Sequence, residues 1–265
     1  MADPILNITR ETDWLTLELN RPDARNALSP EMISALTSEL ARAARDVSIR
    51  GVTLRGAGKV FCAGGDLKGF HALNTEHGSS PENTRTASRE TGRLLRAVAL
   101  QPQPVIVVVH GAAMAGGLGL MAAADIAIVH SGTRFALTET RLGLIPAQIA
   151  PWIVRRAGTI AAKRLMLTGA AFTADEALAL GLADFVETDE AQLRERFERI
   201  KRNIRSCAPG ANRTTKQLIQ HLEAQTLDDF IERAVDAFSQ ALAGEEGQHG
   251  IQSFLDKSPP PWQSN

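Results

Sequence analysis

The stretch that decides the fold is VIVVVHGAAMAGGLGLMAAADIAIV, residues 105–129. The apolar runs at 105–109 and 126–129 predict two buried strands, because each is short, uncharged and rich in β-branched residues. The residues between them are mostly glycine and alanine, whose small size lets one backbone approach another closely. A helix that opens in these glycines would also leave its first N–H groups unobstructed, at the positive end of the helix dipole. Three interpretations follow: a nucleotide-binding turn, a tightly packed helix, or a site for an oxygen that becomes negatively charged.

The nucleotide interpretation rests on a short motif. Residues 117–122 match a loose G-x-G-x-x-A after a strand, and Glu139 lies twenty residues past Gly119. The dinucleotide fingerprint, however, needs its first glycine at the tight turn that leaves the strand. Here the six residues 111–116 intervene between that turn and Gly117, so the spacing disfavours a nucleotide site.

A second glycine-bearing loop favours the interpretation as a charge-stabilising site. FCAGGDL, residues 61–67, follows the predicted strand GVTLRG at 51–56. Its backbone N–H groups can face a ligand, although the same residues could form a plain turn. Two such loops after two apolar strands can together supply the pair of N–H donors that an oxyanion requires.

Glu139 is the candidate acid. It lies within TRFALTETRLGLIP, residues 133–146, between two apolar runs. Partial burial there would raise its pKa and suit it to proton transfer near neutral pH, whereas the nearby Arg141 would oppose that shift. The six histidines show no metal-ligand spacing on one helix, which disfavours a zinc site, and no G-x-S-x-G motif indicates a serine hydrolase.

Local signals organise the rest of the chain. Residues 6–20 alternate in two runs joined at Thr12-Asp13 and predict a hairpin. Ser29, followed by Pro30 and Glu31, predicts the start of a helix. Its expected apolar face consists of Ile33, Leu36, Leu40, Ala43 and Val47.

The middle and the end of the chain differ in character. Residues 71–84 are polar and turn-rich and predict a surface loop before a helix that ends near Leu100. Thr173 and Glu176 form a predicted capping box, and Gly181 ends that short helix. Further helices are expected at about 188–206, 210–224 and 227–243. We therefore predict an α/β core domain over residues 1–195 and a helical region over 196–265.

Composition excludes several classes of protein. The 265 residues include 29 basic and 30 acidic side chains, giving a net charge of −1 and no basic field for nucleic acid. No apolar run reaches the roughly 18 residues of a membrane span, and the N-terminus lacks the pattern of a signal peptide. Cys62 and Cys207 are far apart and suit a reducing compartment. We expect a cytoplasmic protein that binds neither membrane nor nucleic acid.

Taken together, the fragments resemble the crotonase, or enoyl-CoA hydratase/isomerase, family. The resemblance spans nearly the whole chain and is carried by five fragments in the family's order: LNRPDARNALS, GAGKVFCAGGDLKGF, PVIVVVHGAAMAGGLGLMAAADIAIV, TRFALTETRLGLIP and GIQSFLDKSPPPW. It implies an α/β spiral of ββα repeats with a helical C-terminal trimerisation region. It also implies an acyl-CoA thioester as the substrate, a homotrimer or a dimer of trimers, and no separate cofactor, since coenzyme A is part of the substrate.

The resemblance also implies site residues. The two oxyanion N–H groups would belong to Gly65 and Gly116. Arg25 would lie near the CoA phosphates, and Phe254 and Lys257 would reach the nucleotide end of CoA, commonly in a neighbouring subunit. The loop expected to line the path of adenine and pantetheine comprises Ala63, Gly64, Gly65, Asp66 and Leu67.

One family position departs from the pattern. Hydratases of this family carry two glutamates, one in the small-residue helix, but GGLGL places Gly119 there and leaves Glu139 alone. Either Glu139 handles both protons through a bound water, another side chain fills the vacancy, or the reaction needs one base, as in a Δ3-Δ2 isomerase. Loss of the carboxylate would also open room at Gly119 for a branched or carboxylated acyl group. A catalytically silent acyl-CoA-binding subunit is a further alternative.

The sequence after GLIP bears on the substrate. PAQIAP, residues 146–151, replaces the glycine-rich continuation of most relatives and resembles the branch that hydrates isohexenylglutaconyl-CoA in acyclic terpene breakdown, which is related to methylglutaconyl-CoA hydratases. Gln148 would then bind a distal carboxylate or position water, or it would simply face solvent at the start of a helix. The predicted activity is hydration of a branched glutaconyl-CoA.

Overall fold

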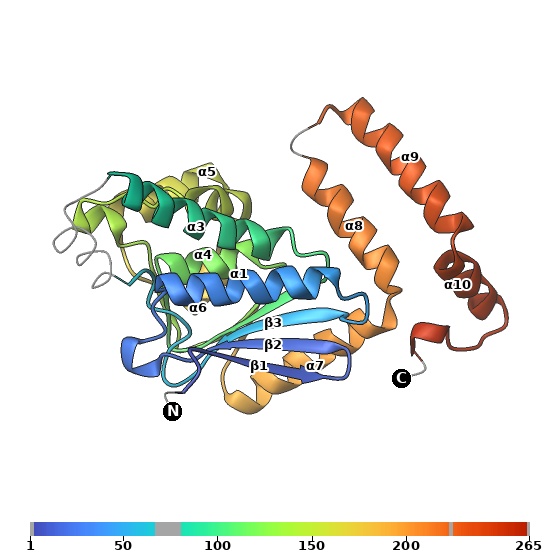
Figure 1. Ribbon diagram of the computed structural model, residues 1–265, viewed down its shortest axis with the longest axis horizontal. Coiled ribbons are helices and arrows are strands. Elements are labelled where there is room, and N and C mark those ends of the chain that lie inside the picture. The colour runs from blue at the N-terminus through green and yellow to red at the C-terminus, as the bar shows by residue number, and fades with distance from the viewer. Residues whose placement is uncertain (1–2, 67–80, 223–224, 264–265) are drawn as a thin grey trace.

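A six-stranded sheet forms the centre of the molecule. The computed structural model describes residues 3–66, 81–222 and 225–263 (Figure 1). The strand order is β1-β2-β3-β4-β6-β9. These strands are β1 (Leu6–Glu11), β2 (Trp14–Leu19), β3 (Gly51–Gly56), β4 (Val105–Val109), β6 (Ile126–His130) and β9 (Phe185–Glu187).

The predicted hairpin and both strands of the deciding stretch are confirmed. β1 pairs antiparallel with β2, with Leu6 opposite Leu19 and Glu11 opposite Trp14. Thr12 forms the turn with φ of 56°. From β2 onward all pairs of this sheet are parallel. Parallel strands end at the same edge, so the loops after β3 and β4 meet there.

A second, three-stranded sheet lies at that edge and was not predicted. It consists of β5 (Ala112–Met114), β7 (Arg134–Ala136) and β8 (Phe172–Thr173). β5 takes up the first small residues after β4, so the small-residue stretch contains a strand before its helix begins. Because β4 and β6 each feed a short strand of this second sheet, the chain winds as a spiral of ββα turns, as expected.

Helices cover both faces of the large sheet. On one face lie α1 (Pro30–Arg45), α3 (Pro81–Ala99), α4 (Gly116–Ala123) and α5 (Ala150–Thr168), and on the other lies α7 (Glu190–Ser206) (Figure 1). The side chains of β4 show why both faces are covered. The hydrophobic core on the side of α1 contains Val105, Val107 and Val109, whereas Ile106 packs with Trp14 on the side of α7. The strand is therefore buried on both faces.

The expected helix signals are largely confirmed. The Ser29 side chain accepts a hydrogen bond from the Met32 N–H at the start of α1. Val47 lies beyond the end of α1 and is 76% exposed, so its assignment to the apolar face was wrong. Thr173 and Glu176 form the capping box of α6 (Ala174–Ala179). Residues 81–84 belong to α3 rather than to the predicted loop, whose residues 71–80 lie outside the described part.

The C-terminal helices form an arm beside the core. α8 (Pro209–His221), α9 (Leu227–Ala243) and the unpredicted α10 (Glu245–Leu255) follow α7. Lys216 of α8 reaches back to the core, where its Nζ lies 2.5 Å from the carboxylate of Asp125. The predicted domain boundary after residue 195 remains a prediction, and it falls inside α7.

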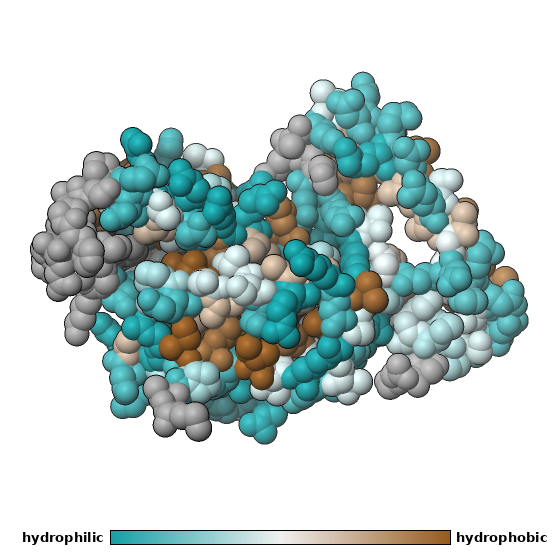
Figure 2. Space-filling view, in the orientation of Figure 1, coloured by the Kyte–Doolittle hydropathy of each residue, from teal (hydrophilic) through white to brown (hydrophobic). Residues whose placement is uncertain are grey.

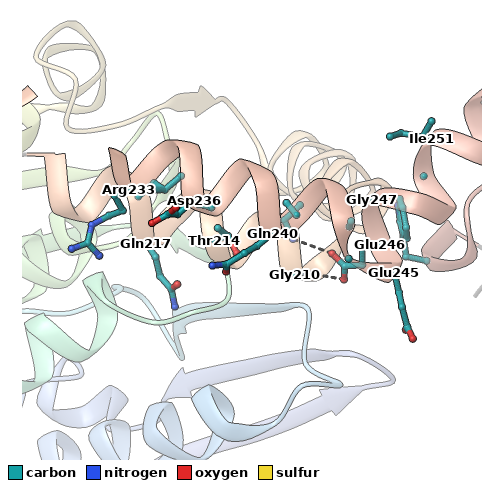
Figure 3. A pocket seen from close by; sticks show the side chains of 18 residues that line it. Gly210, Thr214, Gln217, Arg233, Asp236, Gln240, Glu245, Glu246, Gly247 and Ile251 are labelled. Atoms are coloured by element: carbon teal, nitrogen blue, oxygen red, sulfur yellow. Dashed lines mark hydrogen bonds between the residues drawn. The ribbon is translucent and has the colours of Figure 1, made fainter. Parts of the chain in front are cut away.

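A gap separates α9 and α10 from α8 (Figure 2). It forms a hollow of about 890 Å³ between the three helices. At one end the Glu246 carboxylate accepts hydrogen bonds from the N–H groups of Gly210 and Ala211, at 2.9 and 3.0 Å (Figure 3). Glu246 thereby caps the start of α8, which has no cap of its own.

Within residues 3–66, 81–222 and 225–263, no helix combines the length and the apolar character needed to cross a bilayer.

Candidate active site

The loop after β3 is held between two segments of backbone. Cys62 pairs with β5, since its N–H donates to the Ala112 carbonyl at 3.2 Å and its carbonyl accepts from Met114 at 3.0 Å. On the other side the Leu28 N–H donates to the Gly64 carbonyl at 2.8 Å. These main-chain bonds fix residues 62–65 against the start of α4.

Two glycines permit this close approach. Gly64 has φ of +98°, and a Cβ there would lie 2.8 Å from the Ala115 Cβ. A Cβ on Gly117 would collide with the Cys62 carbonyl oxygen. Ala115 itself has φ of 47° directly before α4, a region that side chains other than glycine seldom adopt. The backbone is therefore strained at the point where the loop and the helix meet.

The Gly65 and Gly116 amides lie next to each other. The Cβ position of Gly116 is 3.7 Å from the Gly65 nitrogen, and both residues line the same cavity. Gly116 is the first residue of α4, so its N–H has no acceptor within the helix. Among the described residues, neither N–H donates a hydrogen bond. Two N–H groups that donate to none of the described residues thus border one cavity.

The cavity has a volume of about 430 Å³ and is mainly apolar. Its floor consists of the two glycines and Leu28, and its walls come from α3 and from residues 138–149. Glu139 is the only acidic side chain among the described residues that line it. A thioester whose oxygen reached the amides would therefore meet a single carboxylate.

Glu139 begins the short helix η2 (Glu139–Leu142) and is half-buried. Its Oε2 atom is buried and has no hydrogen-bond partner among the residues that the structure describes. Burial raises the pKa of Glu139, and a hydrogen bond from its own backbone offsets part of that rise. The expected opposition from Arg141 was wrong, because Arg141 turns away and its Nε donates to the Thr168 carbonyl at 3.4 Å.

The room expected at Gly119 is filled. A Cβ at residue 119 would lie 3.1 Å from Cγ1 of Ile149 and 3.4 Å from Cδ1 of Leu95. Gly119 is buried beneath these side chains and does not line the cavity. The prediction that Gly119 itself admits a branched acyl group was therefore wrong. Ile149, which no sequence motif marks, takes the space beside it.

Gln148 lies at the edge of the cavity and is half-buried. Its Nε2 donates to the Ser88 Oγ of α3 at 3.0 Å. The side chain is thus anchored across the cavity mouth rather than pointing freely into solvent.

The remaining predicted residues are scattered. Ala63 lines the cavity and its N–H donates to the carbonyl of Arg25, whose side chain is exposed. Arg21 binds the Asp66 carboxylate at 3.1 Å. Leu67 lies outside the described residues.

Phe254 and Lys257 are not brought to the cavity. Phe254 is 82% exposed on α10, and Lys257 follows that helix with φ of 51°. Both belong to the arm, on the opposite side of the molecule from α3 and α5 (Figure 1). Their predicted contact with CoA would have to be made to another copy of the chain.

Three hydroxyl residues of the cavity were missed. Thr84, Ser88 and Thr91 of α3 line one wall. Their spacing of four and three residues places them on one helix face. That spacing is visible in the sequence, but it carries a meaning only once the helix is known to begin at Pro81.

The fold is a crotonase-type α/β spiral, and the candidate site contains two backbone N–H groups and one carboxylate. The family model described as "Enoyl-CoA hydratase/isomerase" matches residues 10–265. The chain therefore belongs to the enoyl-CoA hydratase/isomerase family and is an enzyme of the crotonase type.

Known proteins resemble the chain over nearly its whole length. Pseudomonas aeruginosa AtuE shares 40% sequence identity with a TM-score of 0.95, covering 98% of this chain and all of that one. An enoyl-CoA hydratase/isomerase from Marinobacter aquaeolei shares 35% identity with a TM-score of 0.94, covering 98% and 99%. The 1,2-epoxyphenylacetyl-CoA isomerase of Escherichia coli is 33% identical over 253 residues, which are 94% of this chain and 95% of the relative.

Proposed function

We propose that the protein is a lyase that adds water across the α,β-double bond of an enoyl-CoA thioester, using Glu139 as its single acid/base group. The observation that carries this proposal is the shared cavity. It is lined by Gly65 and Gly116, whose N–H groups donate to none of the described residues, and by one half-buried carboxylate, that of Glu139. The similarity to enoyl-CoA hydratases and isomerases supports a thioester substrate.

The chemistry follows from these groups. Glu139 takes a proton from water as the water oxygen adds to Cβ, and the electron pair of the double bond moves through Cα to the thioester oxygen. The two N–H groups hold that oxygen while it is negatively charged; loss of one such donor typically costs about 10²–10³ in turnover. Glu139 then returns the proton to Cα, so one water is consumed and the carboxylate is regenerated. No separate cofactor is required.

The proposed substrate is a branched glutaconyl-CoA such as isohexenylglutaconyl-CoA, an intermediate of acyclic terpene breakdown. Support comes from PAQIAP at residues 146–151 and from the two kinds of wall in the cavity. Leu144 and Ile145 offer apolar surface to a hydrocarbon branch, whereas Ser88 and Gln148 offer polar groups on the side of α3.

The single carboxylate also favours a second candidate, a Δ3-Δ2 enoyl-CoA isomerase, because moving a double bond needs one base only. Gly119 stands where hydratases of the family carry their first glutamate, and the side chain beside it, Ile149, is apolar. No second acid therefore replaces that glutamate from this side. Incubation in heavy water separates the two reactions by product mass. Hydration adds a whole heavy water to a 2-enoyl-CoA, whereas isomerisation of a 3-enoyl-CoA exchanges hydrogen without adding oxygen.

Glu139→Gln tests the proposal. We expect hydration of a panel of branched and carboxylated enoyl-CoAs to fall by at least about 10²-fold, because the variant cannot move the proton. Affinity for the saturated acyl-CoA should persist, as measured by isothermal titration calorimetry. Glu195→Gln, at an exposed position on α7, is the matched control and should keep full turnover. Unchanged turnover in Glu139→Gln would refute the assignment, and affinity without turnover in the wild type would identify a silent binding subunit.

We also propose that the protein works in the cytoplasm as a homotrimer or a dimer of trimers. The support is an exposed apolar row on α9, spaced by four, four, three and four residues and therefore on one helix face. The row consists of Leu227, Ile231, Val235, Phe238 and Leu242. Such a row is typical of a surface that another chain covers.

A further inference from the structure

Helix α3 presents two different faces to two adjoining hollows. Thr84, Ser88 and Thr91 face the catalytic cavity. The neighbouring row along the same helix is Arg85, Arg89, Gly92 and Arg96, with spacing of four, three and four residues. This second row lines an open groove of about 680 Å³. One helix thus separates the reacting centre from an arginine-lined surface.

Gln148 stands where the cavity and the groove join. Thr84, Ser88 and Gln148 line both hollows. The Gln148 amide is fixed there on two sides: its Nε2 donates to Ser88, and its oxygen occupies the place where a side chain on Gly92 would begin. The absence of a side chain at Gly92 therefore leaves room for Gln148 where the linings of the two hollows meet.

The groove is positively charged. Arg85 and Arg89 share Glu82, at 3.9 and 4.0 Å, and Arg93 pairs with Glu90 at 2.5 Å. Arg96 has no ion-pair partner among the described residues. The indole of Trp152 forms the facing wall. This part of α3 therefore carries four guanidinium groups and only two carboxylates. The excess of positive charge would attract an added anion.

We propose that this groove receives a carboxylate carried by the far end of the acyl group, with Gln148 as the residue that positions it. The inference rests on the proposed function, because it takes the thioester oxygen to lie at Gly65 and Gly116. Glu139 and Gln148 line the same cavity as those glycines, and Gln148 also lines the groove, so an acyl group that extends past Glu139 toward Gln148 would bring its end beside the arginines. Arginine guanidinium groups bind carboxylates through short, charge-assisted hydrogen bonds. A purely hydrocarbon acyl end would gain none of these.

The test compares two saturated thioesters that differ only at that end: 3-methylglutaryl-CoA and 3-methylpentanoyl-CoA. Both carry the same CoA, so the ratio of their dissociation constants isolates the carboxylate. Calorimetry measures this ratio without any turnover. The variant is Arg89→Gln combined with Arg96→Gln, and the matched control is Arg202→Gln, an exposed arginine on α7 across the sheet.

We expect the wild type to bind the carboxylated thioester about tenfold more tightly, in a salt-dependent manner. The double variant should lose this preference and keep its affinity for 3-methylpentanoyl-CoA, while Arg202→Gln should keep both. Equal weakening of the two thioesters would show that the arginines bind CoA instead and would overturn the proposal. So would an unchanged ratio in a variant with the wild-type circular dichroism spectrum. Because no hydration is measured, a wild type that binds but never hydrates would contradict the proposed function alone.

Discussion

At the scale of single residues, Glu139 combines two properties that rarely coincide. It is half-buried, and its Oε2 has no partner among the described residues. A buried acceptor without a donor costs free energy, so the folded protein is less stable with Glu139 ionised than with a neutral group in its place. A residue retained at such a cost is a candidate for chemistry.

The raised pKa of Glu139 makes a prediction about stability. The folded state favours the protonated form of Glu139, so protonation of this residue stabilises the fold at low pH. This contribution is lost as the pH rises through the raised pKa of Glu139. Glu139→Gln should therefore unfold at a higher temperature than the wild type at pH 7. That advantage should vanish as the pH falls below the ordinary glutamate range.

Differential scanning fluorimetry across pH 3–8 measures the difference between the two unfolding midpoints. Glu195→Gln, whose carboxylate lies in solvent, serves as the reference for the change in net charge. A Glu139→Gln midpoint equal to or below that of the wild type at pH 7 would contradict the assigned burial.

Site residues could be predicted from the sequence where a short local motif marks them. Gly65, Gly116 and Glu139 stand in short motifs beside apolar runs, and the structure brings all three to one cavity. Ile149 could not be predicted, because its contact with Gly119 joins residues thirty positions apart through the packing of α5 on α4. For the same reason the space at Gly119 looked open.

At the scale of elements, the contact between the loop after β3 and the start of α4 sets the spacing of the two amides. Its tightest point is Gly117 against the Cys62 carbonyl. Since that carbonyl also accepts from Met114, the loop cannot withdraw without breaking its pairing with β5.

Gly117→Ala should therefore reduce both turnover and stability. The added methyl group displaces the loop that carries Gly65, and we expect turnover to fall by about 10²-fold, the effect of losing one oxyanion donor. Turnover and the unfolding midpoint are to be measured together. Gly132→Ala is the control, because its Cβ meets only the His130 side chain, at 3.2 Å. A folded Gly117→Ala variant with full turnover would show that this contact does not set the amide spacing.

Elements with local signals were predicted, and those defined by distant partners were not. The hairpin, α1 and the capping box of α6 each carry their own turn or cap residues. β5 has three residues of small or flexible side chain, and it becomes a strand only by pairing with β7, some twenty residues later. α10 contains Gly247 and Gly250, which weaken the helical signal, and its start is held by the contact of Glu246 with α8.

At the scale of the whole molecule, the arm of α8, α9 and α10 stands beside a well-packed core. The spiral was expected from the family resemblance, whereas the order of the strands was not predicted. The position of the arm depends on a few long-range contacts, such as Lys216 with Asp125, and no sequence motif announces it.

The apolar row on α9 predicts association. Phe238, 70% exposed, lies within it, and Phe238→Asp would place a charge where we expect another copy to pack. Light scattering after size exclusion should give a trimer or hexamer for the wild type and a smaller species for the variant. Val47→Asp, at an exposed site beyond α1, should leave the mass unchanged. A monomeric wild type would contradict the trimer proposal.

The pairing of Cys62 with β5 has a consequence for how such proteins diversify. Both N–H groups proposed to bind the thioester oxygen belong to peptide units, and every amino acid except proline supplies such a group. Replacements along α3 or at Gln148 can then alter which acyl groups are accepted while the activating pair stays in place. With the roles proposed above, the residues that select the acyl group and the residues that activate it would lie in separate parts of the chain and could change independently.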